Sequence, residues 1–392
     1  MSEIPVQNRL CPDVLMNNKP ATMCKIILII ILFVGSTAKS QEYKYYYGNI
    51  HAHTGFSDGN KDQSTTGVKT PAGSYAFAKK SRNFNFLGIS EHNHSQAGMQ
   101  RANFSKGLQQ AAAENKNGSF VCMYGMEFGV ISQGGHVLVY GVDELVGWEQ
   151  NNFDIECAKS DYSALWNIVD DHSHAFATLA HPEATDFNNL LAKPYNKSAD
   201  KAICGVTIST GPAFAKDTNY NSKPAKKFVD YFRGMLAAGY QLGPTIDHDN
   251  HFLTFGRMAS SRTVILAREL NRDSIIDAYR EMRFYASADF NVKVKFTING
   301  FPMGARINTR KAASIKVEVS DPDAGDDVKS IKIMFGSPGS KVLSTELQSI
   351  SNNNKLDVSH DAKKGETFYY YAEITQKDGD KIFTSPIWVR KL

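Results

Sequence analysis

Short apolar runs alternate with segments of helical periodicity over the first two-thirds of the chain. Apolar residues recur at helical spacing in 162–172, 224–239 and 272–282. In the second of these segments, Pro224 suits a first helical turn and Gly239 suits an end. Alternating strands and helices are typical of parallel strands in an α/β sheet or barrel. The apolar runs that predict strands are FNFLGIS (84–90), SFVCMYGMEF (119–128), HVLVYG (136–141), FATLAHP (176–182) and CGVTIST (204–210).

The pattern changes to strands alone after about residue 291. Turn-like stretches separate these strands, including DPDAGDD at 321–327 and KDGD at 377–380. Roughly 100 residues of short alternating strands are typical of an Ig-like β-sandwich. We therefore expect an α/β region over 41–290 and a small all-β sandwich over 291–392. The predicted sandwich strands lie within VKVKFTI, ASIKVEVS, SIKIMFG, TFYYYAEIT and IFTSPIWV.

Residues 1–40 are interpreted as a targeting segment with an upstream extension. Lys25 precedes nine consecutive apolar residues at 26–34, and small residues follow up to Ser40. This order is typical of a secretory signal peptide, whereas a bilayer span needs about 20 apolar residues. We expect a natural start at Met23, cleavage near Ser40/Gln41, and a secreted or periplasmic mature chain without a membrane span. The alternative is an uncleaved anchor.

Composition and charge narrow the class of protein. Apolar residues make up 42% and charged residues 21% of the chain, which is ordinary for a soluble globular protein. The net charge of +4 is small and no Lys/Arg run occurs, so no nucleic-acid surface is expected. Cys157 and Cys204 could pair in an oxidising compartment, while Cys122 is expected to be buried. The oligomeric state is left open.

Imidazole and carboxylate side chains interrupt or end the apolar runs. In GNIHAHTGFSDG (48–59), His51 and His53 stand two residues apart, so they point to the same side of an extended strand. The carboxyl ends of parallel strands meet at one face of a barrel, so these side chains are expected to share one site. This donor mixture suits Zn, Mn or Fe, and its size predicts two or three ions. The residues are His51, His53, Asp58, Glu91, His92, Glu127, His136, His181, Asp249 and His251.

Six segments, HAHTGFSDG, GISEH, GMEF, HVLVYG, LAHPE and DHDNH, resemble in their order the motifs of the PHP family of metallohydrolases, named after polymerase and histidinol phosphatase. The resemblance covers about residues 45–289 and is greatest to secreted PHP-type phosphoesterases and their carbaryl-hydrolase-like relatives. It implies a distorted (β/α)7 PHP-type barrel with a two- or three-metal site, in which Glu127 bridges the ions. The metal ligands that it implies are His51, His53, Asp58, His92, Glu127, His136, His181, Asp249 and His251.

The chain departs from the family pattern at Glu91, where the family usually has Asp. The longer side chain could disturb the surroundings of the ligands or join them. In IDHDNH we prefer the pair Asp249 and His251 over the pair Asp247 and His248. The remaining histidines of this region are interpreted as structural, namely His94, His172, His174 and His248.

The predicted reaction is hydrolysis with a metal-bound hydroxide as the nucleophile, and a small phosphate ester is the favoured substrate. Glu127 is the candidate bridging residue, and His92 or His251 is the candidate proton donor to the leaving group. Arg262 and Arg283 could bind a phosphate group. One alternative is a carboxylic ester or carbamate hydrolase on the same metals. Another is a metal-containing binding protein without activity. We find no convincing Ser/His/Asp or Cys/His set and no G-x-S-x-G turn.

Overall fold

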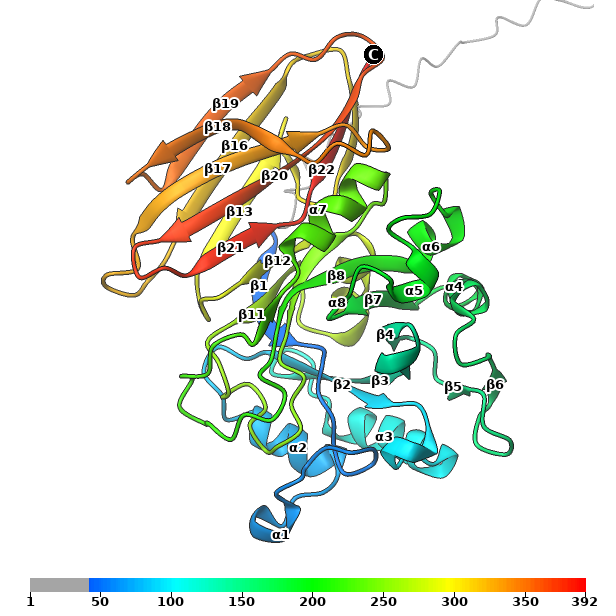
Figure 1. Cartoon of the computed structure of the whole chain (residues 1–392). Coiled ribbons are helices and arrows are strands. Elements are labelled where there is room, and N and C mark those ends of the chain that lie inside the picture. The colour runs from blue at the N-terminus through cyan, green and yellow to red at the C-terminus, as the bar shows by residue number, and fades with distance from the viewer. Residues whose placement is uncertain (1–41) are drawn as a thin grey trace, which may run out of the picture. The chain divides into compact units, whose positions relative to one another are not determined.

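Sixteen strands join into one mixed β-sheet in the computed structural model, which describes residues 42–392 (Figure 1). The predicted targeting segment lies outside the described residues. Three strands attach to the side of the main row, namely β9 (Lys226–Lys227), β15 (Arg306–Thr309) and β22 (Ile387–Lys391). The strands that follow one another along the row are β10 (Gly243–Asp247), β8 (Ile203–Thr210), β7 (Phe176–Ala180), β4 (Gly135–Tyr140), β3 (Val121–Val130), β2 (Phe86–His92), β1 (Lys44–Asn49), β11 (Arg262–Ala267), β12 (Phe284–Ser287), β21 (Lys381–Thr384), β20 (Thr367–Gln376), β17 (Val328–Gly336) and β18 (Thr345–Ser351).

The prediction of a distorted (β/α)7 barrel followed by a separate sandwich is wrong. Strand β4 runs antiparallel to both β3 and β7, and β11 runs antiparallel to β1, so the sheet is mixed. Strand β12 pairs with β21, so the same sheet continues into the C-terminal residues. Connection length explains β4: only the 3₁₀ helix η2 (Ile131–Gln133) separates it from β3, whereas a parallel crossover needs about a dozen residues.

Individual elements agree better with the sequence pattern than the topology does. The five apolar runs form β2, β3, β4, β7 and β8, with ends shifted by a few residues. The segment 224–239 begins its helix only at Val229, because residues 226–227 pair with β8 as β9. Gly239 ends that helix with φ 108, as predicted. The helices within residues 42–392 are α1 (Gln63–Thr66), α2 (Pro71–Ala78), α3 (Arg101–Glu114), α4 (Tyr162–Asp171), α5 (Asp186–Asn189), α6 (Lys197–Ala202), α7 (Val229–Ala238), α8 (Arg272–Arg280), η1 (Ser95–Ala97) and η2.

The C-terminal strands alternate between buried and exposed residues. In β16 (Ala313–Ser320), Val317 is buried while Lys316 and Glu318 are exposed, which is the period of two that a strand with one buried face requires. Val317 belongs to the same hydrophobic cluster as Val264 of β11 and Tyr285 of β12. One core therefore contacts both the C-terminal strands and the strands β11 and β12. The remaining sheets contain β14 (Phe301–Pro302), β13 (Lys293–Ile298), β16 and β19 (Lys355–His360), and the pair β5 (Val146–Gly147) and β6 (Ile155–Glu156).

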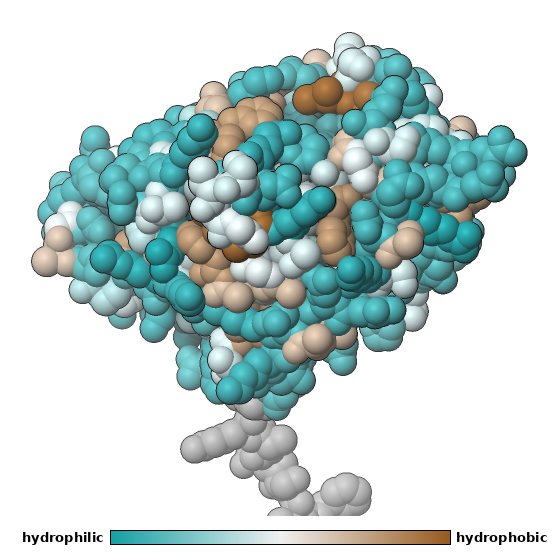
Figure 2. All heavy atoms as spheres, turned by 90° about the horizontal axis from the view of Figure 1, so that it is seen from below, coloured by the Kyte–Doolittle hydropathy of each residue, from teal (hydrophilic) through white to brown (hydrophobic). Residues whose placement is uncertain are grey.

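Three further observations concern the surface, the cysteines and the helices. In the view from below Figure 1, the face is mostly hydrophilic, with hydrophobic and near-neutral residues gathered near its centre (Figure 2). Within residues 42–392, Cys122, Cys157 and Cys204 are all free and buried, so this part of the chain has no disulfide between Cys157 and Cys204. None of the helices in the described range has the length and hydropathy of a transmembrane segment.

Candidate metal centre

Backbone pairing beyond the ends of β1 and β10 brings His51 and His53 to Asp249. The Asp249 amide donates to the His51 carbonyl, and the His53 amide donates to the Asn250 carbonyl, each at 2.9 Å. An isolated parallel bridge between Ala52 and Asn250 continues this pairing. Segments nearly 200 residues apart in sequence therefore lie side by side, with both imidazoles buried.

The registers of β2, β3, β4 and β7 bring further ligands to the same edge of the sheet. His92 ends β2 directly opposite Glu127 of β3. His136 lies near the start of β4 and pairs with Ala180, the last residue of β7. His181 is the residue directly after Ala180. Because β4 runs antiparallel to its neighbours, its beginning lies at the edge where β2 and β7 end. This direction explains why His136 lies near the start of its strand, whereas His92 ends β2 and His181 follows β7.

Glu127 is the centre of the cluster. Its Oε1 lies 3.0 Å from His51 Nε2, 2.9 Å from His136 Nδ1 and 3.2 Å from His181 Nε2. Its Oε2 lies 3.3 Å from His53 Nε2 and 3.1 Å from His92 Nδ1. Both oxygens of one fully buried carboxylate are thus approached by imidazole nitrogens from several strands. A carboxylate in this position is able to bridge two ions.

Two further carboxylates complete the cluster on its more exposed side. Asp249 Oδ1 lies 3.2 Å from His51 Nε2 and 3.1 Å from His53 Nε2. Asp58 Oδ1 lies 3.3 Å from His251 Nε2 and 3.7 Å from His92 Nε2. The side chain of Asp58 is 31% exposed, so solvent and small molecules reach the cluster from this side.

The donor atoms meet the requirements of a metal site better than those of a hydrogen-bond network. Four buried atoms of the cluster have no hydrogen-bond partner, namely His51 Nε2, His92 Nδ1, Asp58 Oδ1 and Glu127 Oε2. Lone pairs that converge without hydrogen-bond geometry are what a cation requires. The chain therefore contains groups that could hold metal ions. They are His53–Asp58–His92–His251, His51–His53–Asp249, His51–Glu127–His181 and His92–Glu127–His136.

All nine predicted ligands lie in these four groups, and the pair Asp249 and His251 belongs to them. Asp247 accepts from His51 Nδ1 instead, at 3.1 Å, and so fixes the orientation of that ring. His248 is buried and contacts the Ser261 carbonyl through Nε2 at 2.9 Å. The structure thus gives the two aspartates of IDHDNH different positions, one facing the other ligands and one behind His51.

Glu91 does not join the ligands. Its carboxylate accepts from the Thr54 amide at 3.0 Å and from the hydroxyls of Thr54 and Ser57. It therefore holds the loop that carries Asp58. The Glu91 side chain thus contacts that loop rather than the cluster.

Two ligands have backbone conformations that non-glycine residues rarely adopt. His181 has φ 29 and Asp249 has φ 54. Each conformation costs of the order of 1–3 kcal/mol, and such strain concentrates at functional sites. Surrounding contacts compensate it here, such as the bond from the Asp249 amide to His51.

Burial and charge set opposing pKa shifts in the cluster. Burial lowers the pKa of His53, but hydrogen bonds and charges from Asp249 and Glu127 outweigh it and raise the pKa to about 10. The same balance of burial against nearby carboxylates raises the pKa values of His51 and His181. For Asp58, burial acts upward, yet His251, His53 and His92 hold its pKa far below the usual range.

These shifts predict that metal removal destabilises the protein more at high pH. A raised histidine pKa stabilises the metal-free fold below about pH 6.5, and this contribution is lost as the pH rises towards about 10. Metal binding requires deprotonated imidazole, so it strengthens over the same range and releases protons. We expect chelator to lower Tm by several degrees more at pH 9 than at pH 6, measured by differential scanning calorimetry. An equal shift at both pH values would contradict this linkage.

The structure does not bring Arg262 or Arg283 to the cluster. Arg262 is fully buried, and burial lowers its pKa to about 10, which leaves it charged at neutral pH. Arg283 lies against the Tyr43 ring and 4.0 Å from Glu281. Arg262 is thus a structural residue rather than a free anion-binding group. Its guanidinium donates to the backbone carbonyls of Arg82, Asn83, Gly256, Ala259 and Ser261.

Replacing Arg262 by methionine is expected to lower the free energy of unfolding by about 3–5 kcal/mol, because buried carbonyls lose their donors. Arg283→Met is the matched control, with an expected loss below about 1 kcal/mol. Urea denaturation of both variants measures the difference. Undiminished stability of Arg262→Met together with weaker substrate binding would favour the substrate-binding role predicted from sequence.

Two residues at the exposed side of the cluster, Lys61 and Phe214, are not among those predicted from the sequence. Lys61 Nζ lies 3.1 Å from Asp58 Oδ2 and 5.6 Å from the centre of the Phe214 ring. Phe214 is 61% exposed, and its ring centre lies 4.8 Å from that of His251. Lys61 stands three residues after Asp58, a proximity that the sequence contained. Phe214 lies in a loop after β8, and no sequence pattern linked it to His251.

The histidines interpreted as structural are accounted for separately. His94 stacks on Trp148 with ring centres 5.7 Å apart. His172 Nδ1 contacts the Ile168 carbonyl at 2.7 Å, which is a local contact within the end of α4. Neither residue belongs to the four metal-ligating groups.

Comparison with known proteins gives no functional description. No protein-family model matches the chain. An uncharacterized protein of Chlamydia trachomatis is 26% identical over 184 residues, which covers 43% of this chain and 30% of that protein. One of Chlamydia muridarum is 25% identical over 138 residues, covering 32% and 22%. The chain thus matches less than a third of the length of either relative.

The likeness to solved structures covers only a small part of this chain. A superoxide reductase (neelaredoxin) from Ignicoccus hospitalis has a TM-score of 0.20 and 12% identity, covering 26% of this chain and 80% of that one. The fibronectin(III)-like modules of Clostridium thermocellum CbhA have a TM-score of 0.18 and 20% identity, covering 26% and 98%. At these TM-scores neither likeness indicates a shared fold or function.

Proposed function

We propose that the protein is a metal-dependent hydrolase of small phosphate esters. The observation that carries the proposal is Glu127, whose two carboxylate oxygens are approached by five imidazole nitrogens. Two or three divalent ions held by the nine ligands would polarise a phosphoryl oxygen and lower the pKa of water. The motif resemblance to PHP metallohydrolases agrees with this chemistry, although it implied a different fold.

The chain's own residues have defined tasks in this proposal. Lys61 lies beside Asp58 at the exposed side, where its ammonium group attracts an anionic ester. His92 and His251 face Asp58 with their Nε2 atoms, so whichever of the two does not hold an ion is positioned to protonate a leaving oxygen. Burial lowers the pKa of His92, which keeps it neutral at pH 7, the form in which an imidazole binds a metal ion.

The second candidate is a carboxylic ester or carbamate hydrolase on the same ligands. The observation that favours it is Phe214, an exposed aromatic ring packed against His251. An apolar acyl or aryl group would bury area against this ring, which stabilises binding by about 25 cal/mol per Å². Arg262, which would have favoured phosphate, donates to backbone carbonyls instead.

The test compares three substrates on the chain from Gln41 onward. p-Nitrophenyl phosphate, bis-p-nitrophenyl phosphate and p-nitrophenyl acetate are assayed with Mn²⁺ or Zn²⁺ and with chelator. We expect release from a phosphate substrate to fall at least about 100-fold with chelator and to return when metal is restored. Chelator-sensitive release from acetate alone would replace the first candidate by the second. Release that ignores chelator, or no release from any of the three substrates, would contradict both.

A further inference from the structure

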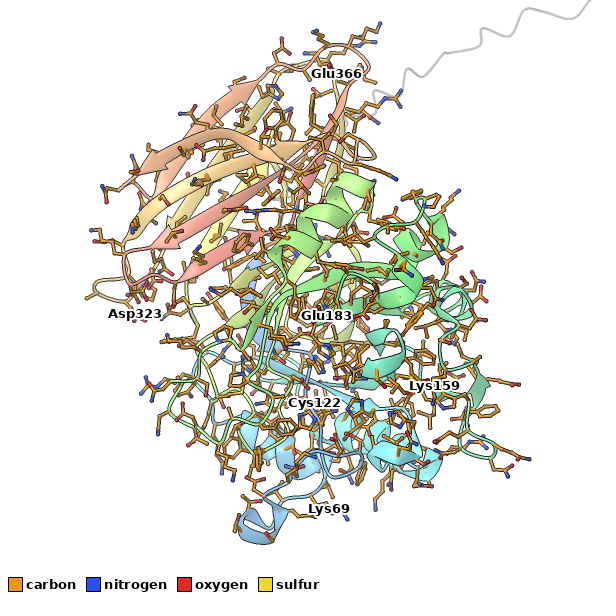
Figure 3. The ribbon with its side chains drawn as sticks, viewed as in Figure 1. Lys69, Cys122, Lys159, Glu183, Asp323 and Glu366 are labelled. Carbon is orange, nitrogen blue, oxygen red and sulfur yellow. The ribbon has the colours of Figure 1, made fainter. Side chains whose placement is uncertain are left out.

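Three loops of the C-terminal half bring aspartates together at a second place, apart from the histidine cluster. Asp289 follows β12, Asp323 and Asp326 lie in the loop between β16 and β17, and Asp378 and Asp380 lie in the turn between β20 and β21. Figure 3 labels Asp323 at the loop end of the C-terminal strands. The sequence DPDAGDD, first interpreted as a turn, therefore meets two other loops.

The carboxylates approach one another without cationic partners. Oxygens of Asp289, Asp323 and Asp326 all lie within 4.8 Å of one another. Asp289 Oδ1 accepts from the amides of Asn291 and Val292, at 2.7 and 2.6 Å, and these bonds fix its direction. Among the ion pairs of residues 42–392, none involves these three aspartates. Like charges at this separation repel unless a cation lies between them.

Two buried amide side chains contact residues of these loops through their nitrogens, and their oxygens have no hydrogen-bond partner. Gln376 is fully buried, and its Nε2 donates to Asp321 Oδ2 at 2.8 Å and to the Asp326 carbonyl at 3.1 Å. Its Oε1 has no hydrogen-bond partner. Asn291 is 9% exposed, its Nδ2 donates to Asp323 Oδ2 at 2.8 Å, and its Oδ1 is likewise unpartnered. Buried amide oxygens without a donor indicate a missing partner.

We propose that Asp289, Asp323 and Asp326 bind one Ca²⁺ ion, with an amide oxygen of Gln376 or Asn291 available as a further ligand. The donors are carboxylate and amide oxygens only, which is the set that Ca²⁺ prefers. The histidine cluster, by contrast, offers imidazoles that suit transition metals. The bound ion would connect the segment after β12 to the loop between β16 and β17. It would therefore stabilise the packing of the C-terminal strands against the preceding part of the chain.

The charge balance supports this site. Asp326 lies close enough to Asp289, Asp321, Asp323 and Asp378 to interact with their charges. The metal-free group therefore has an excess of negative charge that a divalent cation relieves.

Terbium luminescence provides a test that reports on position. Tyr47 donates its hydroxyl to the Asn291 carbonyl at 2.9 Å, and Tyr285 donates to the Val292 carbonyl at 2.6 Å. Both rings therefore lie next to the site and can sensitise bound Tb³⁺. With the histidine cluster preloaded with Zn²⁺, we expect tyrosine-sensitised luminescence that one equivalent of Tb³⁺ saturates and that Ca²⁺ displaces.

The variant Asp323→Asn/Asp326→Asn is expected to weaken Tb³⁺ and Ca²⁺ binding by at least about 10-fold, because two ligand charges are removed. Its Tm without Ca²⁺ is expected to equal or exceed that of the wild type, since repulsion is relieved. Asp327→Asn is the matched control: Asp327 lies in the same loop but pairs with exposed Lys377, and its removal leaves Ca²⁺ binding unchanged.

Two results would overturn the proposal. One is the absence of a Ca²⁺-dependent rise in Tm in the wild type at millimolar Ca²⁺. The other is a rise of equal size in the wild type and in Asp323→Asn/Asp326→Asn. Both readouts are independent of hydrolysis, so they also stand apart from the proposed function.

Discussion

Replacing Glu127 by glutamine is expected to reduce the content of Zn²⁺ or Mn²⁺ in the histidine cluster to at most one ion per chain. Glu127 belongs to two of the four ligand groups, and each of its oxygens faces histidines from different strands. An amide is uncharged and offers one oxygen, so it cannot bridge two ions. The two groups that remain both need His53, and one imidazole nitrogen binds one ion.

Hydrolysis by Glu127→Gln is expected to fall by about 10³-fold or more, because several kcal/mol of transition-state stabilisation depend on the second ion. Glu183→Gln is the matched control, since it makes the same chemical change two residues from His181. Glu183 is 62% exposed and forms an ion pair with Lys226, and its position is labelled in Figure 3. Elemental mass spectrometry counts the ions. Wild-type metal content in Glu127→Gln would contradict the bridging role.

Double substitution of His51 and His53 by alanine is expected to leave at most one Zn²⁺ or Mn²⁺ ion in the histidine cluster of each chain. Three of the four ligand groups contain at least one of these histidines. Only the group His92–Glu127–His136 remains complete. Activity is expected to fall by about 10³-fold or more for the same reason as in Glu127→Gln. The two variants differ in which group survives, so they test the assignment of ligands independently.

His172→Ala/His174→Ala is the control for this double substitution, because it removes two histidines of the same spacing outside the cluster. Circular dichroism checks that each variant is folded, since His51 and His53 are fully buried and their removal leaves space in the core. Metal content equal to the wild type in the folded His51→Ala/His53→Ala variant would remove these residues from the ligand set.

The meeting of the nine side chains could be predicted because their positions depend on strand ends, which apolar runs reveal. His51 and His53 follow β1, and His92 ends β2, where the pattern changes from apolar to polar. The fold could not be predicted in the same way. A run such as HVLVYG reads alike in either direction, so the antiparallel β4 and the pairing of β12 with β21 were not evident.

Other contacts were beyond the sequence for a related reason. The sequence suggests that Arg262 is free to bind an anion, but its guanidinium donates to carbonyls of the loop just before it and of residues 82–83, which are distant in sequence. Phe214 faces His251 only because the loop after β8 folds over the end of β10. Long-range packing of loops decides these contacts, and periodicity carries no information about it.

We propose that the nine-residue cluster binds two or more divalent ions around Glu127. Anomalous X-ray diffraction from crystals grown with Zn²⁺ or Mn²⁺, with data collected on both sides of the metal absorption edge, locates such ions. We expect at least two anomalous peaks about 4 Å apart, with Glu127 between them. A map without anomalous peaks among His51, Glu127 and Asp249, or with a single peak remote from Glu127, would contradict this proposal.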